Sequence, residues 1–408
     1  MDAVNGGLVA FLGGGPGIGG LYRICRELRE GLRGHGLTVR WLCLGPDPQA
    51  IITSPEWAHE REFGSVLAQD TRDERRQALT LLDHLETAGY KAVLVNVLAD
   101  RVQSNVVRHL DPRIRRIMIV HNITPGTYAA AKSIRDYVHA TVGVSPRIRD
   151  DLVQRVGFPA EYTHAIGNAF DGDIFERLER QPWDGPLRLL SLGRLEDASK
   201  GIFWLPALLR ELRDVPLTLT IAGTGPDEAE LRRLFSGQMD QVRFVGVVPP
   251  DEVANIMVRH DVFLFPSRYE GHPVALIEAI ATGCVPVASH LRGVTDVVVD
   301  PGETGFLFPV GDIRSAARLV RKIAADREML GRMSIAGRAT AVARFRCDRM
   351  AAAYAEVIEA AMTSPRTIAA PLPRGEWRLP PGLRPGWRTL LPTTVKNGLR
   401  LVKERLEL

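Results

Sequence analysis

The sequence predicts an α/β protein built from two doubly wound domains. Short apolar segments alternate with helical patterns through both halves of the chain, as expected of βαβ units with parallel sheets. The 408 residues are too many for one ordinary hydrophobic core and fit two domains of roughly 150 to 200 residues. A hydrophobic content of 45% and a charged content of 25% are typical of a globular protein.

The first half contains five candidate strands, each a short apolar run that ends in a turn or a helical pattern. They are Leu8–Leu12, Leu37–Leu44, Ala92–Leu98, Arg116–Val120 and Ala140–Val144. We expect these strands to form the sheet of an N-terminal domain that ends near residue 170.

A glycine-rich loop follows the first strand and precedes a helical pattern. Gly15, Gly17 and Gly20 have the G-x-G-x-x-G spacing of dinucleotide-binding loops. Such sites also place an acidic residue at the end of the second strand, but here Asp47 comes late, in a turn. The hypothesis that the protein is an NAD-dependent oxidoreductase therefore rests on this loop alone. The loop lacks the lysine and hydroxyl residue of a P-loop, which excludes that class.

His121 directly follows the strand Arg116–Val120. The carboxyl end of a parallel strand is where open α/β sheets bind ligands, so His121 is a candidate site residue. The alternative is a structural histidine held by a hydrogen bond.

The second half contains further strands, at Leu187–Leu192, Leu217–Ile221 and Val262–Phe265. We place the join between the domains near residues 171–186. The predicted division is 1–170 for the N-terminal domain, 171–345 for the C-terminal domain, 346–363 for a helix that crosses back, and 364–408 for a tail.

Two carboxylates eight positions apart mark the most informative segment of the chain. Glu270 lies in a loop after the strand Val262–Phe265, and Glu278 lies in the helix that follows. We expect this helix to begin at Pro273 and to end at Gly283. Its N-terminus favours a phosphate, and a carboxylate about a turn deeper suits the paired hydroxyls of a ribose. Together these groups favour a nucleotide-sugar; the alternative is two solvated acids.

Two cations follow the strand Leu187–Leu192, namely Arg194 and Lys200. Cations at the carboxyl end of a strand, opposite a helix N-terminus, suit a leaving diphosphate that no metal neutralises. The sequence shows no His, Cys, Asp or Glu cluster with metal-ligand spacing and no suitable DxD motif. We therefore expect no metal and no other cofactor.

These motifs resemble those of the retaining glycosyltransferases of family 4, also called glycosyl transferases group 1, which have the GT-B fold of two Rossmann-like domains facing across a cleft. The family's E-G-x-P-x-x-L-x-E-A motif corresponds here to Glu270-Gly271-His272-Pro273-Val274-Ala275-Leu276-Ile277-Glu278-Ala279. The commoner form has Phe-Gly where this chain has His272 and Pro273. The family's G-R-L…K-G motif corresponds to residues 193–201, and the resemblance extends over roughly residues 5–360.

The resemblance implies a role for each matched residue. Arg194 and Lys200 would hold the diphosphate and Glu278 the ribose, with the base near Val245 and Val247. The sugar would lie against Glu270 and the backbone around Gly271, His272, Pro273 and Val274, with His121 on its other side and Gly19 and Gly20 close to the donor. The catalytic set is thus Glu270, His121, Arg194 and Lys200.

The function that follows is transfer of a sugar from a UDP- or GDP-linked donor to an acceptor hydroxyl, in the synthesis of a polysaccharide, glycolipid or other glycoconjugate. Retention of anomeric configuration is implied by the resemblance. The alternatives are a nucleotide-sugar epimerase or hydrolase of the same fold, the oxidoreductase above, and a binding module without catalysis.

The last 45 residues differ in composition from the rest. From Ser364 onward there are nine Arg or Lys and three Glu, a net charge of +6 against +4 for the whole chain. Trp377 and Trp387 stand among the arginines, and a short amphipathic helix is expected at Val395–Leu406. Such a tail can dock on an anionic membrane surface, or it can pack back on the N-terminal domain. Its basic-aromatic content is not accompanied by a nucleic-acid-binding motif, so we expect no nucleic acid.

The cysteines and the hydropathy indicate the compartment. Cys25, Cys43, Cys284 and Cys347 are scattered, with no CxxC motif and no signal peptide. No run of eighteen apolar residues is present. We expect a cytoplasmic protein, with peripheral attachment to the membrane as an option.

Overall fold

The computed structural model describes residues 7–13, 15–17, 20–55, 57–170, 172, 178–180, 185–386 and 391–406. The chain forms two compact units. The first comprises Met1–Asn168 and Cys347–Leu390, and the second comprises Ala169–Arg346 and Leu391–Leu408. The chain thus passes from one unit to the other three times, and the tail expected as one piece at 364–408 is divided between them at residue 390.

The first unit contains a seven-stranded sheet whose strands are all parallel, in the order β3-β2-β1-β4-β5-β6-β7. The strands are β1 (Leu8–Leu12), β2 (Thr38–Leu44), β3 (Gly64–Leu67), β4 (Ala92–Asn96), β5 (Arg115–Val120), β6 (Ala140–Gly143) and β7 (Thr163–Ala165). The five expected strands are present, β1 with the expected bounds and the other four with one end shifted by one or two residues, while β3 and β7 were not expected.

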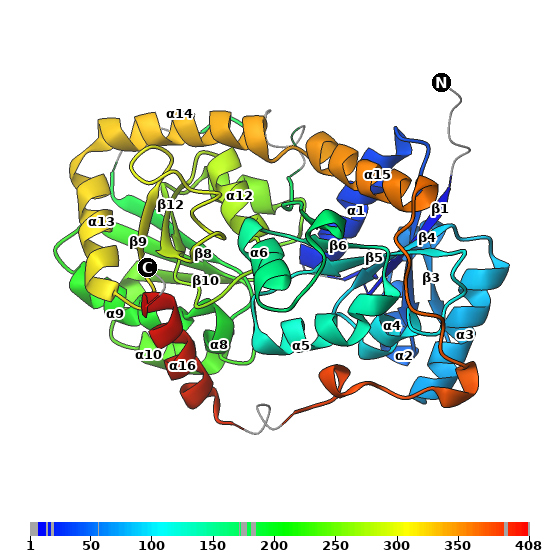
Figure 1. Ribbon diagram of the computed structural model, residues 1–408. Helices are drawn as coiled ribbons and strands as arrows, with labels where there is room; N and C mark the ends of the chain where they lie inside the picture. The colour runs from blue at the N-terminus through cyan, green and yellow to red at the C-terminus, as the bar shows by residue number, and fades with distance from the viewer. Residues whose placement is uncertain are drawn as a thin grey trace. The chain divides into compact units, whose positions relative to one another are not determined.

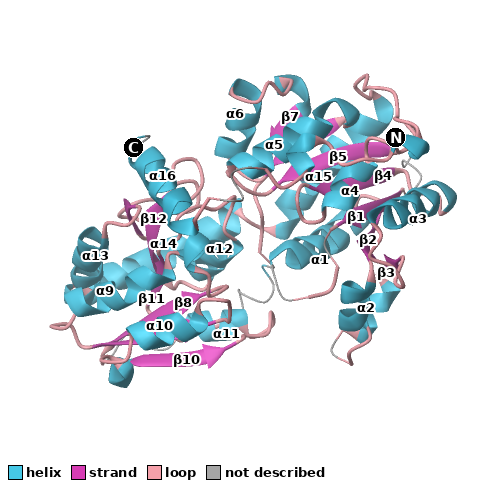
Figure 2. Cartoon of the chain, turned by 90° about the horizontal axis from the view of Figure 1, so that it is seen from below, coloured by secondary structure: helices cyan, strands magenta, loops and turns pink. Residues whose placement is uncertain are grey.

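Helices cover both faces of this sheet (Figure 2). They are α1 (Gly20–Arg33), α2 (Pro46–Ile52), α3 (Glu74–Thr87), α4 (Arg101–Val106), α5 (Pro125–Ile134), α6 (Pro146–Gln154) and α15 (Cys347–Thr363). Asp73 and Asp100 cap α3 and α4 by accepting backbone N–H groups, which satisfies donors that a helix start leaves open. The late helix α15 packs on α1 so closely that a Cβ at Gly31 would lie 2.4 Å from the Cβ of Ala351.

The second unit contains a six-stranded parallel sheet in the order β10-β9-β8-β11-β12-β13 (Figure 1). The strands are β8 (Leu187–Leu192), β9 (Leu217–Ala222), β10 (Val242–Gly246), β11 (Val262–Phe265), β12 (Val285–His290) and β13 (Phe306–Pro309). The helices are α8 (Asp197–Lys200), α9 (Leu205–Glu211), α10 (Glu228–Leu234), α11 (Val253–Val258), α12 (Val274–Ala281), α13 (Ile313–Ala325), α14 (Arg327–Arg344) and α16 (Thr393–Leu406).

Apolar side chains cover both faces of the second sheet. Successive residues point to opposite faces, so Leu189 and Leu264 enter one buried cluster while Leu190 and Phe263 enter another. This two-sided burial explains why the strands appear in the sequence as continuous apolar runs without alternation.

The two parts of the tail follow different units. On the first unit, the Leu372 N–H donates to the Arg108 carbonyl over 2.8 Å, and the Trp377 ring lies 5.1 Å from that of His109. The second part forms α16, the helix expected at Val395–Leu406, which packs near α8. Trp387 lies outside the described residues. Within the described part of the chain, no helix is both long and apolar enough to cross a bilayer.

Candidate active site

The centre of the candidate site in the second unit is an ion pair between Lys200 and Glu270. The Lys200 Nζ lies 2.6 Å from Glu270 Oε1, and the Ser267 hydroxyl donates to the same oxygen over 2.7 Å. Lys200 ends α8 and Glu270 follows β11; because β8 and β11 are parallel neighbours, the segments after them meet at one edge of the sheet. The structure thus joins two residues that the sequence placed seventy positions apart.

Glycine permits close approaches between the segments that follow β8, β9 and β11 at this edge of the sheet. Gly201 has a φ of +63°, and a Cβ there would lie 2.3 Å from the carbonyl oxygen of Pro266. Gly223 has a φ of +121°, and its Cβ would lie 1.9 Å from the carbonyl oxygen of Gly193. Only glycine fits these backbone conformations and contacts without strain.

A second ion pair fixes the same two segments and was missed by sequence reasoning. The Arg268 guanidinium contacts Asp197 at 2.7 Å and stacks 3.8 Å from the centre of the Trp204 ring. Arg268 also donates from its backbone N–H to the Ser199 carbonyl over 2.8 Å. These contacts hold the segments that carry Lys200 and Glu270. The sequence offered only their position as a signal, because Asp197 lies within the 193–201 motif and Arg268 stands two residues before Glu270.

Arg194 follows β8 at the same edge but is less constrained. Its side chain is 68% exposed, and its contact with Glu196 is an ion pair of 3.9 Å, longer than a hydrogen bond. Arg194 is therefore free to reorient toward an anionic ligand.

Helix α12 begins and ends within two residues of the expected bounds and carries the second carboxylate, Glu278. Pro273 is its N-cap residue, and Gly283, with a φ of +73°, stands just after its end. Glu278 is only 3% exposed, so its carboxylate is almost wholly withdrawn from water. Before the helix, Gly271, His272 and Pro273 are buried, and Val274, the first residue of the helix, is partly buried.

His272 is buried, and its ring is neutral at pH 7. Its ring centre lies 5.8 Å from that of Phe345, and burial lowers its pKa to about 4. The N-terminus of α12 therefore carries no imidazolium at neutral pH, and its positive potential comes from the backbone N–H groups.

The expected base-binding segment lies at the end of β10. Val245 is partly buried and packs against the core, whereas Val247 beyond the strand is 44% exposed. An exposed apolar side chain of this size offers a surface against which a flat base can pack.

In the first unit, His121 lies at the carboxyl end of β5 with its tautomer defined by a neighbour. The Asn96 amide N–H donates to the Leu12 carbonyl over 2.7 Å, which turns its Oδ1 toward His121 Nε2 at 2.6 Å. His121 must therefore carry its proton on Nε2, leaving the Nδ1 lone pair available. Burial lowers the pKa of His121 to about 4, so the ring is neutral at pH 7.

The glycine loop gives a mixed result. Gly19 lies outside the described residues. Gly20 starts α1, and a Cβ there would meet no atom within 4 Å, so packing within the chain does not require glycine at this position. At Gly15, in contrast, a Cβ would lie 2.2 Å from Cys43 Sγ. Asp47, the late acid of this region, is engaged by Arg72 through contacts of 2.7 and 2.9 Å.

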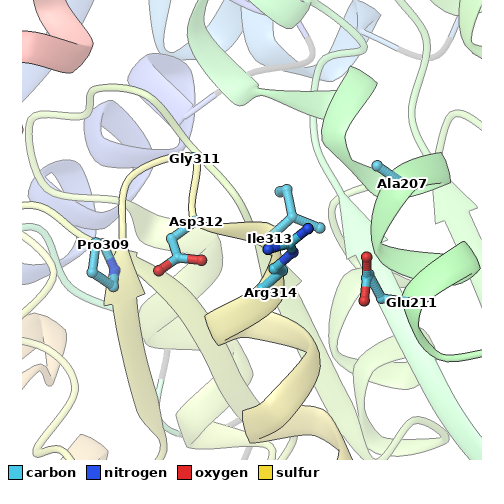
Figure 3. Close-up of a pocket in the computed structure, with 7 residues that line it drawn as sticks. All are labelled: Ala207, Glu211, Pro309, Gly311, Asp312, Ile313 and Arg314. Carbon is cyan, nitrogen blue, oxygen red and sulfur yellow. The ribbon is translucent and has the colours of Figure 1, made fainter.

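A separate pocket of about 630 Å³ lies in the second unit beside α9 and the start of α13 (Figure 3). Its lining residues are Ala207, Glu211, Pro309, Gly311, Asp312, Ile313 and Arg314. None of these is a predicted site residue, and the Asp312 carboxylate already caps α13 by accepting from the Ser315 N–H over 3.0 Å. Among the described residues, no group of three or more His, Cys, Asp or Glu side chains is placed to hold a metal ion.

The two parallel sheets with their flanking helices define a GT-B fold. Sucrose-phosphate synthase from Thermosynechococcus elongatus superimposes with a TM-score of 0.71 at 21% identity, over 86% of this chain and 98% of that one. The Anabaena protein HepE, solved in complex with UDP-glucose, superimposes with a TM-score of 0.70 at 17% identity, over 87% of this chain and 100% of that one. Identities this low establish the fold alone.

Sequence comparison identifies a family that part of the chain resembles. Residues 174–340 match the family described as Glycosyl transferases group 1. Glycogen synthase of Mycobacterium tuberculosis is 31% identical over 244 residues, which are 58% of this chain and 58% of that protein. The chain thus spans a little over half the length of this relative. The family match includes every predicted donor-binding residue of the second unit but not His121, Gly19 or Gly20. The comparisons support a glycosyltransferase.

Proposed function

We propose that this protein transfers a sugar from a UDP- or GDP-linked donor to an acceptor hydroxyl, with retention and without a metal, in the synthesis of a polysaccharide, glycolipid or other glycoconjugate. The observation that carries the proposal is the Lys200–Glu270 pair of 2.6 Å beside the start of α12, within the part of the chain that matches the glycosyltransferase family. The UDP-glucose bound by HepE, a protein of the same fold, is in keeping with such a donor.

In this proposal the donor lies on the second unit. Its diphosphate contacts Arg194, Lys200 and the N–H groups at the start of α12, its ribose contacts Glu278, and its base packs near Val247. The Arg194 side chain is exposed and its ion pair with Glu196 is long, so it can turn toward the phosphates and bind them. The two cations stabilise the charge that develops on the leaving diphosphate as the glycosidic bond breaks.

The donor sugar is held by Glu270 and by the backbone around Gly271 to Val274. Lys200 and Ser267 fix the Glu270 carboxylate in one orientation, which leaves its second oxygen, Oε2, for a sugar hydroxyl. In the first unit, neutral His121 is proposed to accept a hydrogen bond from a substrate hydroxyl through its unprotonated Nδ1. The acceptor is proposed to bind the first unit.

A nucleotide screen tests this proposal. Thermal unfolding would be measured with UDP, GDP, ADP, NAD and NADP on the wild type, on Glu278→Ala and on the isosteric Glu278→Gln. A nucleotide at about 100 times its dissociation constant adds about 2.7 kcal/mol to the free energy of unfolding. We expect UDP or GDP to stabilise the wild type and to lose most of this effect in both variants.

The same screen, together with a turnover assay on the nucleotide-sugar with and without acceptor, separates the alternatives. Stabilisation by NAD alone would overturn the proposal in favour of an oxidoreductase. Turnover of the nucleotide-sugar at an undiminished rate without any acceptor would favour an epimerase or hydrolase, and binding without any turnover would favour a binding module.

We also propose that α16 attaches the protein to the cytoplasmic face of an anionic membrane. Val395, Leu399 and Val402 follow one another at helical spacing and are 45%, 64% and 57% exposed, and four basic residues stand in the sequence of this helix. Sedimentation with phosphatidylcholine vesicles, with and without phosphatidylglycerol, tests this attachment. We expect the wild type to bind only the anionic vesicles and Leu399→Glu to lose this binding. Equal sedimentation of wild type and variant would contradict the attachment through α16.

A further inference from the structure

A second pocket, of about 570 Å³, lies wholly within the first unit. It is lined by residues from the starts of α3 and α4 and from the first part of the tail: Arg72, Asp73, Glu74, Arg75, Arg101, Trp377, Arg378, Leu379, Arg384 and Pro385. Helix α3 follows β3 and α4 follows β4, so the pocket lies at the carboxyl edge of the parallel sheet. Open α/β sheets bind their ligands at this edge.

The tail contributes half of the lining and is fixed to the unit by its backbone. The Arg378 carbonyl accepts from Asn105 Nδ2 over 3.2 Å, and the Trp377 ring packs on His109. The Arg374 guanidinium contacts Asp83 and Glu86 of α3 at 2.5 Å each. In Figure 1 this segment runs past α4 and α3. These anchors hold Trp377 and Arg378 at the pocket.

The charge of the lining is unbalanced. Two of its five guanidiniums have carboxylate partners, since Arg72 pairs with Asp47 and Arg101 with Glu74. Within the described residues, no carboxylate lies at ion-pair distance from Arg75, Arg378 or Arg384.

The acidic members of the lining compensate for only part of the charge of these three arginines. One carboxylate oxygen of Asp73 accepts the backbone N–H of Arg76 and so caps α3. Glu74 forms an ion pair with Arg101. Three arginines without a carboxylate partner against the one remaining carboxylate of Asp73 leave the lining with a net positive charge, which attracts an anion.

From this arrangement we propose that the arginine pocket binds a phosphate or diphosphate group of the acceptor substrate. Guanidinium groups bind phosphate oxygens through two parallel hydrogen bonds, and this lining offers three arginines that have no carboxylate partner among the described residues. The volume lies in the range of small-molecule sites and leaves room for a sugar next to the phosphate, against the partly buried Trp377.

The assignment to the acceptor rests on the proposed function. Every residue proposed to hold the donor nucleotide belongs to the second unit, so the arginine pocket is not part of the donor's nucleotide site. The pocket also depends on Trp377, Arg378 and Arg384, which lie beyond the part of the chain that matches the family. A tail that completes an acceptor pocket would adapt a shared fold to one acceptor class.

Calorimetric titration of the full chain with inorganic pyrophosphate tests the pocket. UDP is first added to saturation, so that the donor site cannot take up the probe, and ionic strength is held constant. The variant Arg75→Gln with Arg378→Gln removes two exposed guanidiniums, and Arg332→Gln is the matched control because Arg332 is 68% exposed on α14 of the other unit.

We expect the double variant to bind pyrophosphate roughly tenfold to a hundredfold more weakly than the wild type, and the control to bind it unchanged. Equal affinity in all three proteins, or no pyrophosphate binding in the presence of UDP, would overturn the proposal. The UDP titration gives a separate result. If UDP does not bind, this counts against the proposed function. The comparison of the three proteins with pyrophosphate would still test the role of the arginines.

Two further probes distinguish the sources of the phosphate. Glucose 1-phosphate represents a soluble acceptor, and phosphatidylcholine vesicles containing phosphatidic acid represent a lipid-linked one. Binding of either probe that the double variant loses and the control keeps supports the acceptor assignment and identifies its source. If both probes bind the double variant as tightly as the wild type, the acceptor assignment is overturned.

Discussion

Replacement of Lys200 by alanine is expected to separate catalysis from stability. The Lys200 ammonium is 30% exposed and Glu270 is 12% exposed, so their pair is only partly withdrawn from water. Pairs of this kind contribute on the order of 1 kcal/mol or less to the free energy of unfolding. After the substitution Glu270 still accepts the Ser267 hydroxyl at 2.7 Å, which limits the loss further.

The catalytic effect of the same substitution is larger. Removing one preorganised group that stabilises developing charge typically lowers kcat by about 10²–10³, equivalent to about 2.7–4 kcal/mol in the activation free energy. We therefore expect Lys200→Ala to lose about 10²–10³ in kcat, while its dissociation constant for UDP rises less than kcat falls. The Tm should decrease by only a few degrees.

The assay combines initial rates of sugar transfer, UDP titration and thermal unfolding on the same preparations. Lys322→Ala is the control, since Lys322 is an exposed lysine of the same unit on α13, 5.2 Å from the Phe306 ring and outside the proposed site. Turnover near that of the wild type in Lys200→Ala would refute the role given to this cation. A fall in turnover that is matched by loss of folded protein would refute the separation of the two effects.

Three further predictions concern the supports of the site. Gly223→Ala should lower the free energy of unfolding by roughly 2–4 kcal/mol because its Cβ would meet backbone, while Gly237→Ala, whose Cβ meets nothing within 4 Å, should cost less than about 1 kcal/mol; equal urea midpoints would contradict this. Asn96→Asp should raise the pKa of His121 from about 4 to above about 5, because a carboxylate favours the imidazolium. An unchanged pKa in an NMR titration would contradict the contact between residue 96 and His121. The pKa of His272 is lowered to about 4 in the folded protein, so on acidification the unfolded chain binds a proton at this residue before the folded protein does, and the free energy of unfolding falls as the pH drops from 7 to 5. In His272→Gln this fall should be smaller by about 2 kcal/mol, as measured by urea unfolding at both pH values.

The parts of the fold that could be predicted are those with a strong local signal. The run Val262–Phe265 is apolar on both faces, and both Pro273 and Gly283 mark the ends of α12, so these elements were placed closely. Strand β3 was missed because its four residues begin at a glycine that packs against the Trp41 side chain, a long-range reason that no local pattern contains.

The candidate site shows the same limit. The types and spacing of Lys200, Glu270 and Glu278 were visible in the sequence, but the direct contact of the first two depends on the order of β8 and β11 in the sheet. The arginine pocket was hidden for a similar reason. Arg75 and Arg378 are about three hundred positions apart, and only the return of the tail to the first unit brings them together.

The order in which the two units are completed has a consequence for synthesis of the protein. The sheet of the first unit is made from residues up to 168, but α15, which covers α1, begins only at Cys347. At typical translation rates the chain between them takes roughly 10–35 s to emerge from the ribosome. During that interval the tightly fitted surface around Gly31 is without its helix. A nascent chain that must wait in this way is exposed to chaperones and to premature association, and a protein expressed only to residue 168 would keep that exposed face permanently.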